Sequence, residues 1–196
     1  MPDPFEQLVD GLLAHNYGQV GDFLDPPLIV ALRHHLLDRF ERGKMHEAGI
    51  GNQALFQKNK AVRGDFISWI DETTANEDEQ KFLRRVNDFV EYLNRTCYAG
   101  IRSIEFHYAL YPEGSFYRRH KDQFRTDSGR KFSLITYLNE DWREADGGQL
   151  VLYGETEEKI NPQAGRAVFF RADEIEHEVL EARRPRMSLT GWLKNR

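Results

Sequence analysis

Hydrophobic side chains in the first half of the chain recur every three or four residues, which is the spacing of amphipathic helices. Asp25 is suited to cap one of these helices, and Pro26 and Pro27 suit its first turn. The pattern predicts three helices, which run from Phe5 to a stop at Gly18, from Asp25 to Gly43, and from near Asn76 to about Thr96. We expect these helices to support the fold and not to carry chemistry.

From residue 101 onward the pattern changes to short runs in which apolar and polar side chains alternate, as in half-buried strands. Turns rich in Gly, Pro and Asp separate the runs, and no helical run is long enough for a parallel crossover. The predicted strands are 62–70, 104–111, 132–139, 149–153, 167–171, 176–180 and 187–193. The fold class that follows is α+β, mainly β, with helices packed on an antiparallel sandwich or barrel. The stretches 44–61 and 71–75 lack periodicity and are predicted as loops.

Length and composition favour one globular unit. The 196 residues are 40% hydrophobic and 30% charged, and we expect a single domain, 1–196, with mainly helical support and an early strand in 1–97 and a β-rich core in 98–196. The net charge of −5 and the pI of about 5.8 argue against a general nucleic-acid binder. The lone Cys97 fits a reducing compartment. Because the sequence has no secretory start and no long apolar stretch, we expect a cytoplasmic monomer without membrane contact.

Three residues in the strand-rich half are candidate metal ligands. His120 and Asp122 are two positions apart, so on a strand they would share a face, and His177 follows later. Two imidazoles and one carboxylate form the facial triad of non-haem Fe(II) oxygenases, which leaves positions open for a co-substrate and O₂. A His-x-Asp pair followed by another His also occurs by chance, so this spacing leaves both interpretations open.

Arg186 adds a second component to the candidate site. Its parity places it on one strand face with Thr190 and Trp192. If that face lines the interior, the planar guanidinium can clamp a dicarboxylate whose other end chelates the metal, and the hydroxyl of Thr190 can add a contact. Arg183 and Arg184 are interpreted as solvated charges.

Several motifs follow one another in a particular order between Val62 and Trp192. They are Arg63-Gly64-Asp65 with Trp69, Tyr111-Pro112, Tyr117 and Arg119 before His120 and Asp122, Tyr137-Leu138-Asn139 with Asp141-Trp142, Gly147-Gly148, Phe169-Phe170, His177-Glu178-Val179, Arg186 and Trp192. In this series the chain resembles the Fe(II)- and 2-oxoglutarate-dependent prolyl 4-hydroxylases, specifically the oxygen-sensing type and its bacterial relatives. Segment 112–117 is one residue shorter than in the animal enzymes, and the loop 71–79 differs in character. These departures concern peptide specificity.

The resemblance implies a double-stranded β-helix, or jelly-roll, core and gives roles to residues at matching positions. Arg186 and Tyr137 would bind the distal carboxylate of 2-oxoglutarate, and Tyr111 would lie nearer the metal end. O₂ would be the second co-substrate, with ascorbate as a reductant. The implied residues are the Fe(II) ligands His120, Asp122 and His177, and the co-substrate residues Tyr111, Tyr137, Arg186, Thr190 and Trp192.

The leading hypothesis is a dioxygenase that hydroxylates a prolyl residue at the 4-position in a loop of a protein substrate. By resemblance to the bacterial relatives, elongation factor Tu is a candidate substrate, and oxygen sensing is a candidate role. One alternative is an oxygenase of the same chemistry that acts on a small molecule or an alkylated base. Another is a non-catalytic module that binds metal or 2-oxoglutarate. The segment from Asp71 to Glu79 is interpreted either as a lid over the site or as a surface connector.

Overall fold

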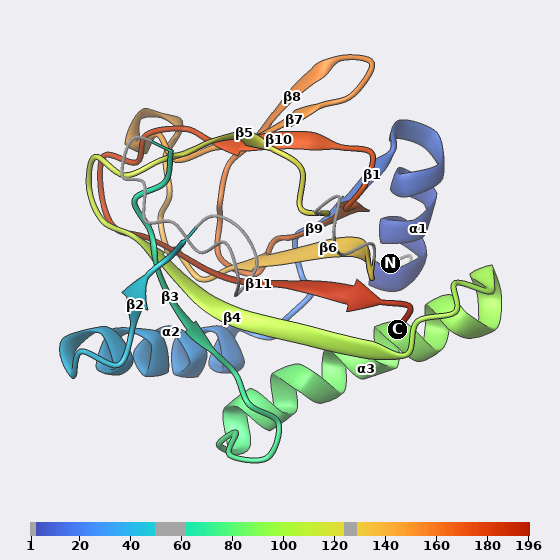
Figure 1. Ribbon diagram of the computed structural model, residues 1–196, viewed down its shortest axis with the longest axis horizontal. Coiled ribbons are helices and arrows are strands. Elements are labelled where there is room, and N and C mark those ends of the chain that lie inside the picture. The colour runs from blue at the N-terminus through green and yellow to red at the C-terminus, as the bar shows by residue number, and fades with distance from the viewer. Residues whose placement is uncertain (1–2, 50–61, 124–128) are drawn as a thin grey trace.

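The computed structural model describes residues 3–49, 62–123 and 129–196, which form two antiparallel sheets, three α-helices and one 3₁₀-helix (Figure 1). The helices are α1 (Pro4–His15), α2 (Pro26–Glu41), α3 (Glu77–Cys97) and η1 (Glu144–Asp146). The larger sheet contains, in spatial order, β1 (Tyr17–Val20), β9 (Ala167–Arg171), β6 (Arg130–Tyr137), β11 (Arg186–Lys194), β4 (Ser103–Tyr111), β3 (Phe66–Trp69) and β2 (His46–Glu47). The smaller sheet contains β5 (Tyr117–His120), β10 (Glu176–Val179), β7 (Leu150–Tyr153) and β8 (Glu157–Ile160). This confirms the predicted fold class, α+β and mainly β.

The three predicted helices are confirmed, and side-chain caps explain where they begin, as α2 and α3 show. Asp25 accepts a hydrogen bond from the backbone N–H of Leu28 at 2.8 Å, and α2 starts at Pro26. At the start of α3, the side chain of Asn76 accepts from the N–H of Glu79, while the carboxylate of Glu79 accepts from the N–H of Asn76, both at 3.0 Å. This reciprocal capping box satisfies two N–H groups that a bare helix end would leave without partners.

The outer face of the larger sheet packs against α2 and α3, which lie below it in Figure 1. Phe89 of α3 meets Phe169 of β9 with ring centroids 5.0 Å apart, and Phe82 meets Phe106 of β4 at 5.1 Å. These edge-on contacts belong to the main hydrophobic core and cover the sheet on the side away from β5 and β10. The helices therefore act as the predicted support.

Strand β11 shows how the sheet separates its two faces. Leu189 and Leu193 are buried in the core that faces the helices. Arg186, Thr190 and Trp192 point to the opposite face and line a cavity between the sheets. The predicted parity of Arg186 with Thr190 and Trp192 is confirmed, because side chains of a strand alternate between its faces.

Four strands were not predicted: β1, β2, β5 and β8 have at most four residues each, and polar side chains dominate β2, β5 and β8. Their pairing depends on neighbouring strands, which the local pattern does not reveal. In the predicted loop 44–61, residues 46–47 form β2, and residues 50–61 lie outside the described residues. The predicted loop 71–75 is confirmed as a turn, in which the N–H of Thr74 donates to the carbonyl of Asp71 at 3.1 Å.

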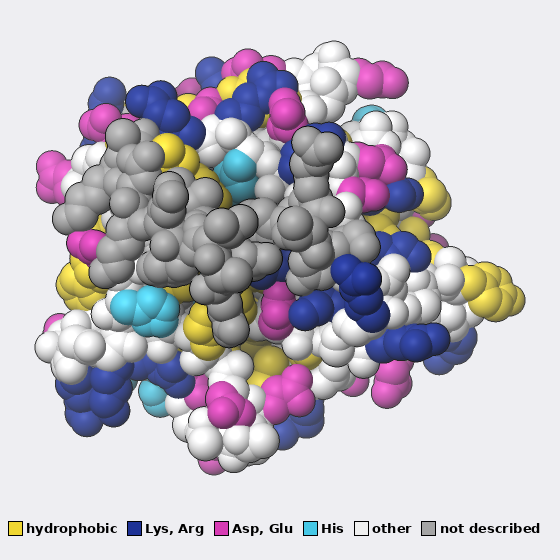
Figure 2. All heavy atoms as spheres, in the orientation of Figure 1, with side chains coloured by type: hydrophobic (Ala, Val, Ile, Leu, Met, Phe, Trp, Pro, Cys, Tyr) yellow, Lys and Arg dark blue, Asp and Glu magenta, His cyan; other side chains and the backbone are white. Residues whose placement is uncertain are grey.

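The surface is that of a charged globular protein. On the face shown in Figure 2, acidic and basic side chains are interspersed and do not separate into patches of one sign. Cys97 ends α3 and is exposed. Among the described helices, none is both long and apolar enough to cross a bilayer.

Candidate metal centre and co-substrate cavity

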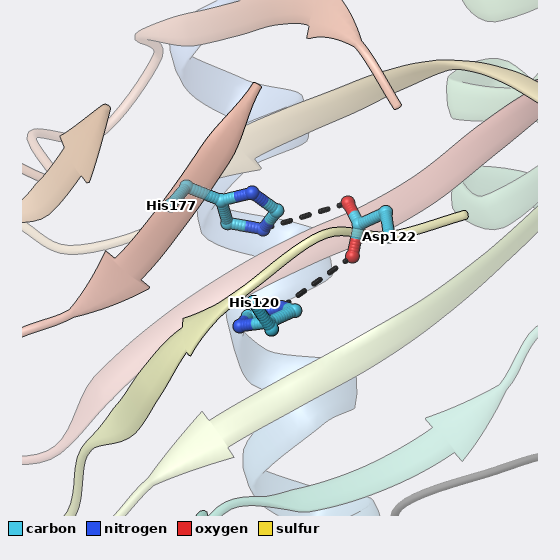
Figure 3. A group of neighbouring side chains, drawn as sticks. All are labelled: His120, Asp122 and His177. Carbon is cyan, nitrogen blue, oxygen red and sulfur yellow. Dashed lines mark ion pairs between the residues drawn. The ribbon is translucent and has the colours of Figure 1, made fainter. Parts of the chain in front are cut away.

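His120, Asp122 and His177 converge at one point between the sheets (Figure 3). His120 ends β5 and pairs with His177 of β10 across the smaller sheet. Asp122 lies in a bend two residues beyond β5, so the ligands do not converge through strand alternation alone. Nε2 of His120 lies 3.5 Å from Oδ1 of Asp122, and Nε2 of His177 lies 3.6 Å from Oδ2. All three ligand atoms lie within 4.8 Å of one another.

Hydrogen bonds hold each of these side chains in place. Nδ1 of His120 lies 2.8 Å from the carbonyl oxygen of Arg118, and Nδ1 of His177 lies 3.3 Å from that of Ile175. Since a carbonyl only accepts, each Nδ1 carries a hydrogen, and the neutral form of each ring then has its lone pair on Nε2, where it can bind a metal. The hydroxyl of Ser133 donates to Oδ2 of Asp122 at 2.7 Å.

The surroundings of His177 and Asp122 keep both side chains in the protonation state that binds a metal. Burial lowers the pKa of His177 to about 4, so its ring is neutral near pH 7. Burial acts to raise the pKa of Asp122, but His177, His120 and the Ser133 hydroxyl outweigh it and hold that pKa well below its usual range. The cluster therefore offers neutral imidazole and an ionised carboxylate, as a divalent metal requires.

The donor set fits a transition metal that keeps open positions. Two imidazole nitrogens and one carboxylate oxygen form a mixed set, whereas structural zinc sites close the ion with four ligands. Of the described residues, this trio is the group whose ligand atoms come close enough together to hold an ion. The three side chains border a cavity of about 570 Å³, which leaves room for further metal ligands.

Arg186 lies in the same cavity and is only 1% exposed. Its Nε donates to the carbonyl of Gly148 at 2.8 Å, and its guanidinium lies 4.9 Å from the ring centre of Tyr111 and 5.1 Å from that of Tyr137. No described carboxylate forms an ion pair with it. A buried cation without a counter-ion points to an anionic ligand, because an isolated buried charge is costly.

The structure brings the predicted site residues together. All of them line the cavity except Tyr137, which lies behind it against Arg186. The hydroxyl of Tyr137 is buried and makes no hydrogen bond to a described residue, and burial raises its pKa, so it keeps the hydrogen that it can donate. Nε1 of Trp192 is likewise buried without a partner. Such unused hydrogen-bonding groups are typical of a ligand site.

Comparison with known proteins identifies the family. Residues 106–194 match the family described as the 2OG-Fe(II) oxygenase superfamily. The crystal structure of a prolyl-4-hydroxylase from Pseudomonas putida is 38% identical and has a TM-score of 0.88, and the match covers 98% of this chain and 99% of that one. The chain belongs to the Fe(II)- and 2-oxoglutarate-dependent prolyl hydroxylases. The predicted double-stranded β-helix core is thereby confirmed, and Fe(II) is the metal of the His120, Asp122 and His177 triad, with 2-oxoglutarate as co-substrate.

This prolyl hydroxylase is also similar to two further prolyl hydroxylases. A prolyl hydroxylase from Trichoplax adhaerens, solved with a peptide of the hypoxia inducible factor oxygen degradation domain, is 27% identical with a TM-score of 0.87, and the match covers 97% of this chain and 89% of that one. Prolyl 3-hydroxylase OGFOD1 of Xenopus laevis is 28% identical over 131 residues, 59% of this chain. The matched part is 25% of the length of that protein.

The sequence pattern did not mark several residues of this hydroxylase that lie around the site. Ser133, which binds Asp122, stands between Phe132 and Leu134 in an alternating strand, and its inward parity was the available signal. His107 is buried and lines the cavity from β4. No local pattern marks it, because its neighbours come from other strands.

The lid interpretation of the segment from Asp71 to Glu79 does not fit the structure. Its first part is a turn, its last three residues begin α3, and Glu79 is 1% exposed and bound to Arg39 at 2.5 Å. None of its residues is among the described residues that line the cavity. The capping box and the buried ion pair therefore explain this segment as a connector that anchors a helix.

Proposed function

We propose that this protein hydroxylates C4 of a prolyl residue in a protein substrate, with Fe(II) as cofactor and 2-oxoglutarate and O₂ as co-substrates. The observation that carries the proposal is that the triad and the buried Arg186 border one cavity. One dicarboxylate can then meet the metal with one end and the guanidinium with the other. Identity of 38% over nearly the whole length with a protein named as a prolyl-4-hydroxylase supports attack at the 4-position.

In this proposal the residues of the chain bind and orient the co-substrate. The planar fork of Arg186 binds the distal carboxylate, and the hydroxyl of Tyr137 donates to the same group. Tyr111 packs against the guanidinium, and Thr190 and Trp192 complete the pocket wall. When bound, Fe(II) supplies the position at which O₂ is activated, while 2-oxoglutarate is oxidised and loses CO₂ to give succinate.

An aromatic wall beside the triad supports a peptide substrate that presents proline. The rings of Trp69 and His107 lie 4.9 Å apart, and those of His107 and Trp192 lie 5.4 Å apart. Trp69 is 43% exposed, so the wall extends from the cavity to the surface. Aromatic-lined grooves are a recurring way to bind prolyl segments. The Trichoplax relative was solved with a peptide, which agrees with this chemistry.

Elongation factor Tu is the protein substrate that we place first, through a proline in a loop of its switch region. The choice rests on the resemblance to the bacterial relatives and on the aromatic wall described above. An oxygen-sensing role is part of the same proposal and requires turnover that follows O₂ across the cellular range. The charge distribution around the cavity favours a protein over a nucleic acid, because Arg119 pairs with Glu176 and Arg130 with Glu105.

The test is to incubate the purified protein with elongation factor Tu, Fe(II), 2-oxoglutarate and ascorbate in air. We expect stoichiometric succinate and one oxygen atom added to one loop peptide, with 4-hydroxyproline found after hydrolysis. His177→Ala is the inactive control, because it removes a metal ligand. Repeating the assay over a series of O₂ concentrations tests the sensing role.

Each other outcome rejects a defined part of the proposal. 3-Hydroxyproline would reject the position of attack, in line with the Xenopus relative. Succinate formed with cell extract but with no modified protein would favour the small-molecule alternative. No succinate with any substrate, although the protein binds metal and 2-oxoglutarate, would favour the non-catalytic module.

A further inference from the structure

Tyr117 and His120 stack face to face at the metal centre. Their ring centroids are 3.6 Å apart and their planes differ by 18°. Positions i and i+3 of a regular strand point to opposite faces, so the two rings should not meet. The pairing with β10 is irregular here, since Val179 pairs with Tyr117 but His177 pairs with His120. The segment of β5 between these pairs is thus one residue longer than the segment of β10 opposite it. This extra residue is a β-bulge, and it turns both rings to one face.

Arg63 covers the other face of Tyr117. Its guanidinium carbon lies 4.1 Å from the centre of the tyrosine ring. A cation and an imidazole this close to one ring cannot share a face, so Tyr117 is sandwiched between Arg63 and His120. Arg63 is itself held by two bonds to the buried carboxylate of Asp65, of 2.7 and 2.6 Å. Its backbone forms an antiparallel bridge with Tyr117.

His120 needs this support more than the other two ligands do. Its side chain is 18% exposed, compared with 9% for Asp122 and 5% for His177. The rings of His177 and Phe170 lie 4.8 Å apart in a T-shaped contact, and Ser133 holds Asp122. The hydrogen bond from Nδ1 of His120 to its own strand does not by itself remove the freedom of the ring plane to turn, and the ring of His177, with its centroid 4.3 Å away, is tilted by 56° to it. A flat partner on the ring face removes this freedom.

We propose that Tyr117 and Arg63 are positioning residues that hold the His120 ring in the plane required for metal binding. The inference rests on the metal role of the triad. Asp65, Arg63, Tyr117 and His120 form one continuous series of contacts, in which the ion pair fixes the guanidinium, the guanidinium fixes the tyrosine and the tyrosine fixes the ligand. Partners behind metal ligands commonly set metal affinity in this way.

The same sheet provides a matched control. Arg119 lies 3.8 Å from the ring centre of Tyr153, so this pair repeats the arginine-over-tyrosine contact of Arg63 and Tyr117. Tyr153 lies on β7, donates to Glu178 and touches no metal ligand in the described contacts. Tyr153→Leu therefore removes an equivalent ring from the same sheet without affecting the triad.

The experiment measures the affinity for Mn(II), a divalent ion with a signal in electron paramagnetic resonance that is lost on binding. We expect Tyr117→Leu to weaken Mn(II) binding about tenfold or more and Tyr117→Phe, which keeps the flat ring, to restore it to within about threefold. Arg63→Lys keeps a charge beside Asp65 but loses the planar stack, so an intermediate loss of about threefold to tenfold is expected. Tyr153→Leu is expected to bind like wild type.

Thermal unfolding of the metal-free proteins shows whether a variant that binds Mn(II) weakly is also less stable than wild type. This comparison separates a loss of positioning from general destabilisation. If Tyr117→Leu binds Mn(II) like wild type, or if Tyr153→Leu loses as much affinity as Tyr117→Leu, the positioning role is rejected. If Tyr117→Phe is as weak as Tyr117→Leu, the stacked ring is not the cause and the inference also fails. A wild type that binds no Mn(II), or a His120→Ala variant that binds it equally well, would reject the metal centre and with it the proposed function.

Discussion

The hydroxyl of Ser133 donates to Oδ2 of Asp122 at 2.7 Å, and both side chains are buried. Asp122 lies beyond the end of β5, so strand pairing does not orient its carboxylate. The bond from β6 in the opposite sheet supplies that orientation. One carboxylate oxygen is thereby directed away from Ser133, towards His120.

Ser133→Ala should therefore weaken metal binding by about tenfold, because a partner behind a metal ligand commonly contributes that much. Calorimetric titration with Mn(II) measures the change. Thr96→Ala is the matched control, because Thr96 makes a similar hydroxyl bond on α3, to the carbonyl of Tyr92. Equal affinity of Ser133→Ala and wild type would contradict the role given to this bond.

Arg186→Lys should raise the dissociation constant for 2-oxoglutarate by about tenfold or more. Lysine keeps the charge but loses the fork and the bond from Nε to Gly148. Titration of the Mn(II)-loaded protein with 2-oxoglutarate gives the value. Arg183→Lys, at an exposed position that donates to the carbonyl of Ala145, should bind the ligand normally. If both variants behave alike, Arg186 is not the anion-binding residue.

Glu79→Ala should lower the free energy of unfolding by about 3 kcal/mol, because it removes a buried partner of Arg39 and half of the capping box of α3. Urea unfolding followed by circular dichroism measures this loss. Glu77→Ala is the control two positions away, at a side chain that is 81% exposed, and should change little. A loss for Glu79→Ala no larger than that of the control would show that this ion pair does not stabilise the fold.

His107 should make the protein less stable in mild acid. Burial, together with the nearby Arg63 and Arg130, lowers its pKa in the folded state to about 3. Below pH 6.5 the unfolded chain binds a proton that the folded state does not, so stability falls by roughly 1.4 kcal/mol per pH unit.

Urea unfolding at pH 7.5 and 5.5 tests this linkage in wild type and in His107→Phe. We expect wild type to lose about 1 kcal/mol more than the variant over this interval. His15→Phe, the same substitution at an exposed position, controls for the loss of one histidine. An identical pH dependence in wild type and His107→Phe would contradict the prediction.

The site was predictable to the extent that its residues carry local signals. His120 and Asp122 are close in sequence, and Arg186 shares a strand parity with Thr190 and Trp192, so spacing made them candidates and the ordered motifs gave them roles by resemblance. Ser133 and His107 reach the site only through strand pairing, and a bulge turns Tyr117, which the motif series contains without a role, towards His120. Pairing joins residues far apart in the chain, and no local pattern records it.

The lid interpretation failed for a related reason. The segment from Asp71 to Glu79 is polar, and polarity alone does not distinguish a lid from a connector that is held in place. Glu79 is buried because Arg39, forty positions earlier, provides its counter-ion. The short strands β2, β5 and β8 were missed because their charged residues pair with neighbours that the local pattern does not contain.

By itself, the sequence determined the helices, the strands of five or more residues and the mainly β fold class, because periodicity is a local property, and it marked the metal ligands as candidates whose role came from the family resemblance. Only the tertiary structure decided how these ligands are held. The bulge in β5, the bond from Ser133 and the placement of Arg63 over Tyr117 all depend on contacts between segments distant in the chain. Such contacts form when burial of apolar surface brings the sheets together, which is a property of the whole chain.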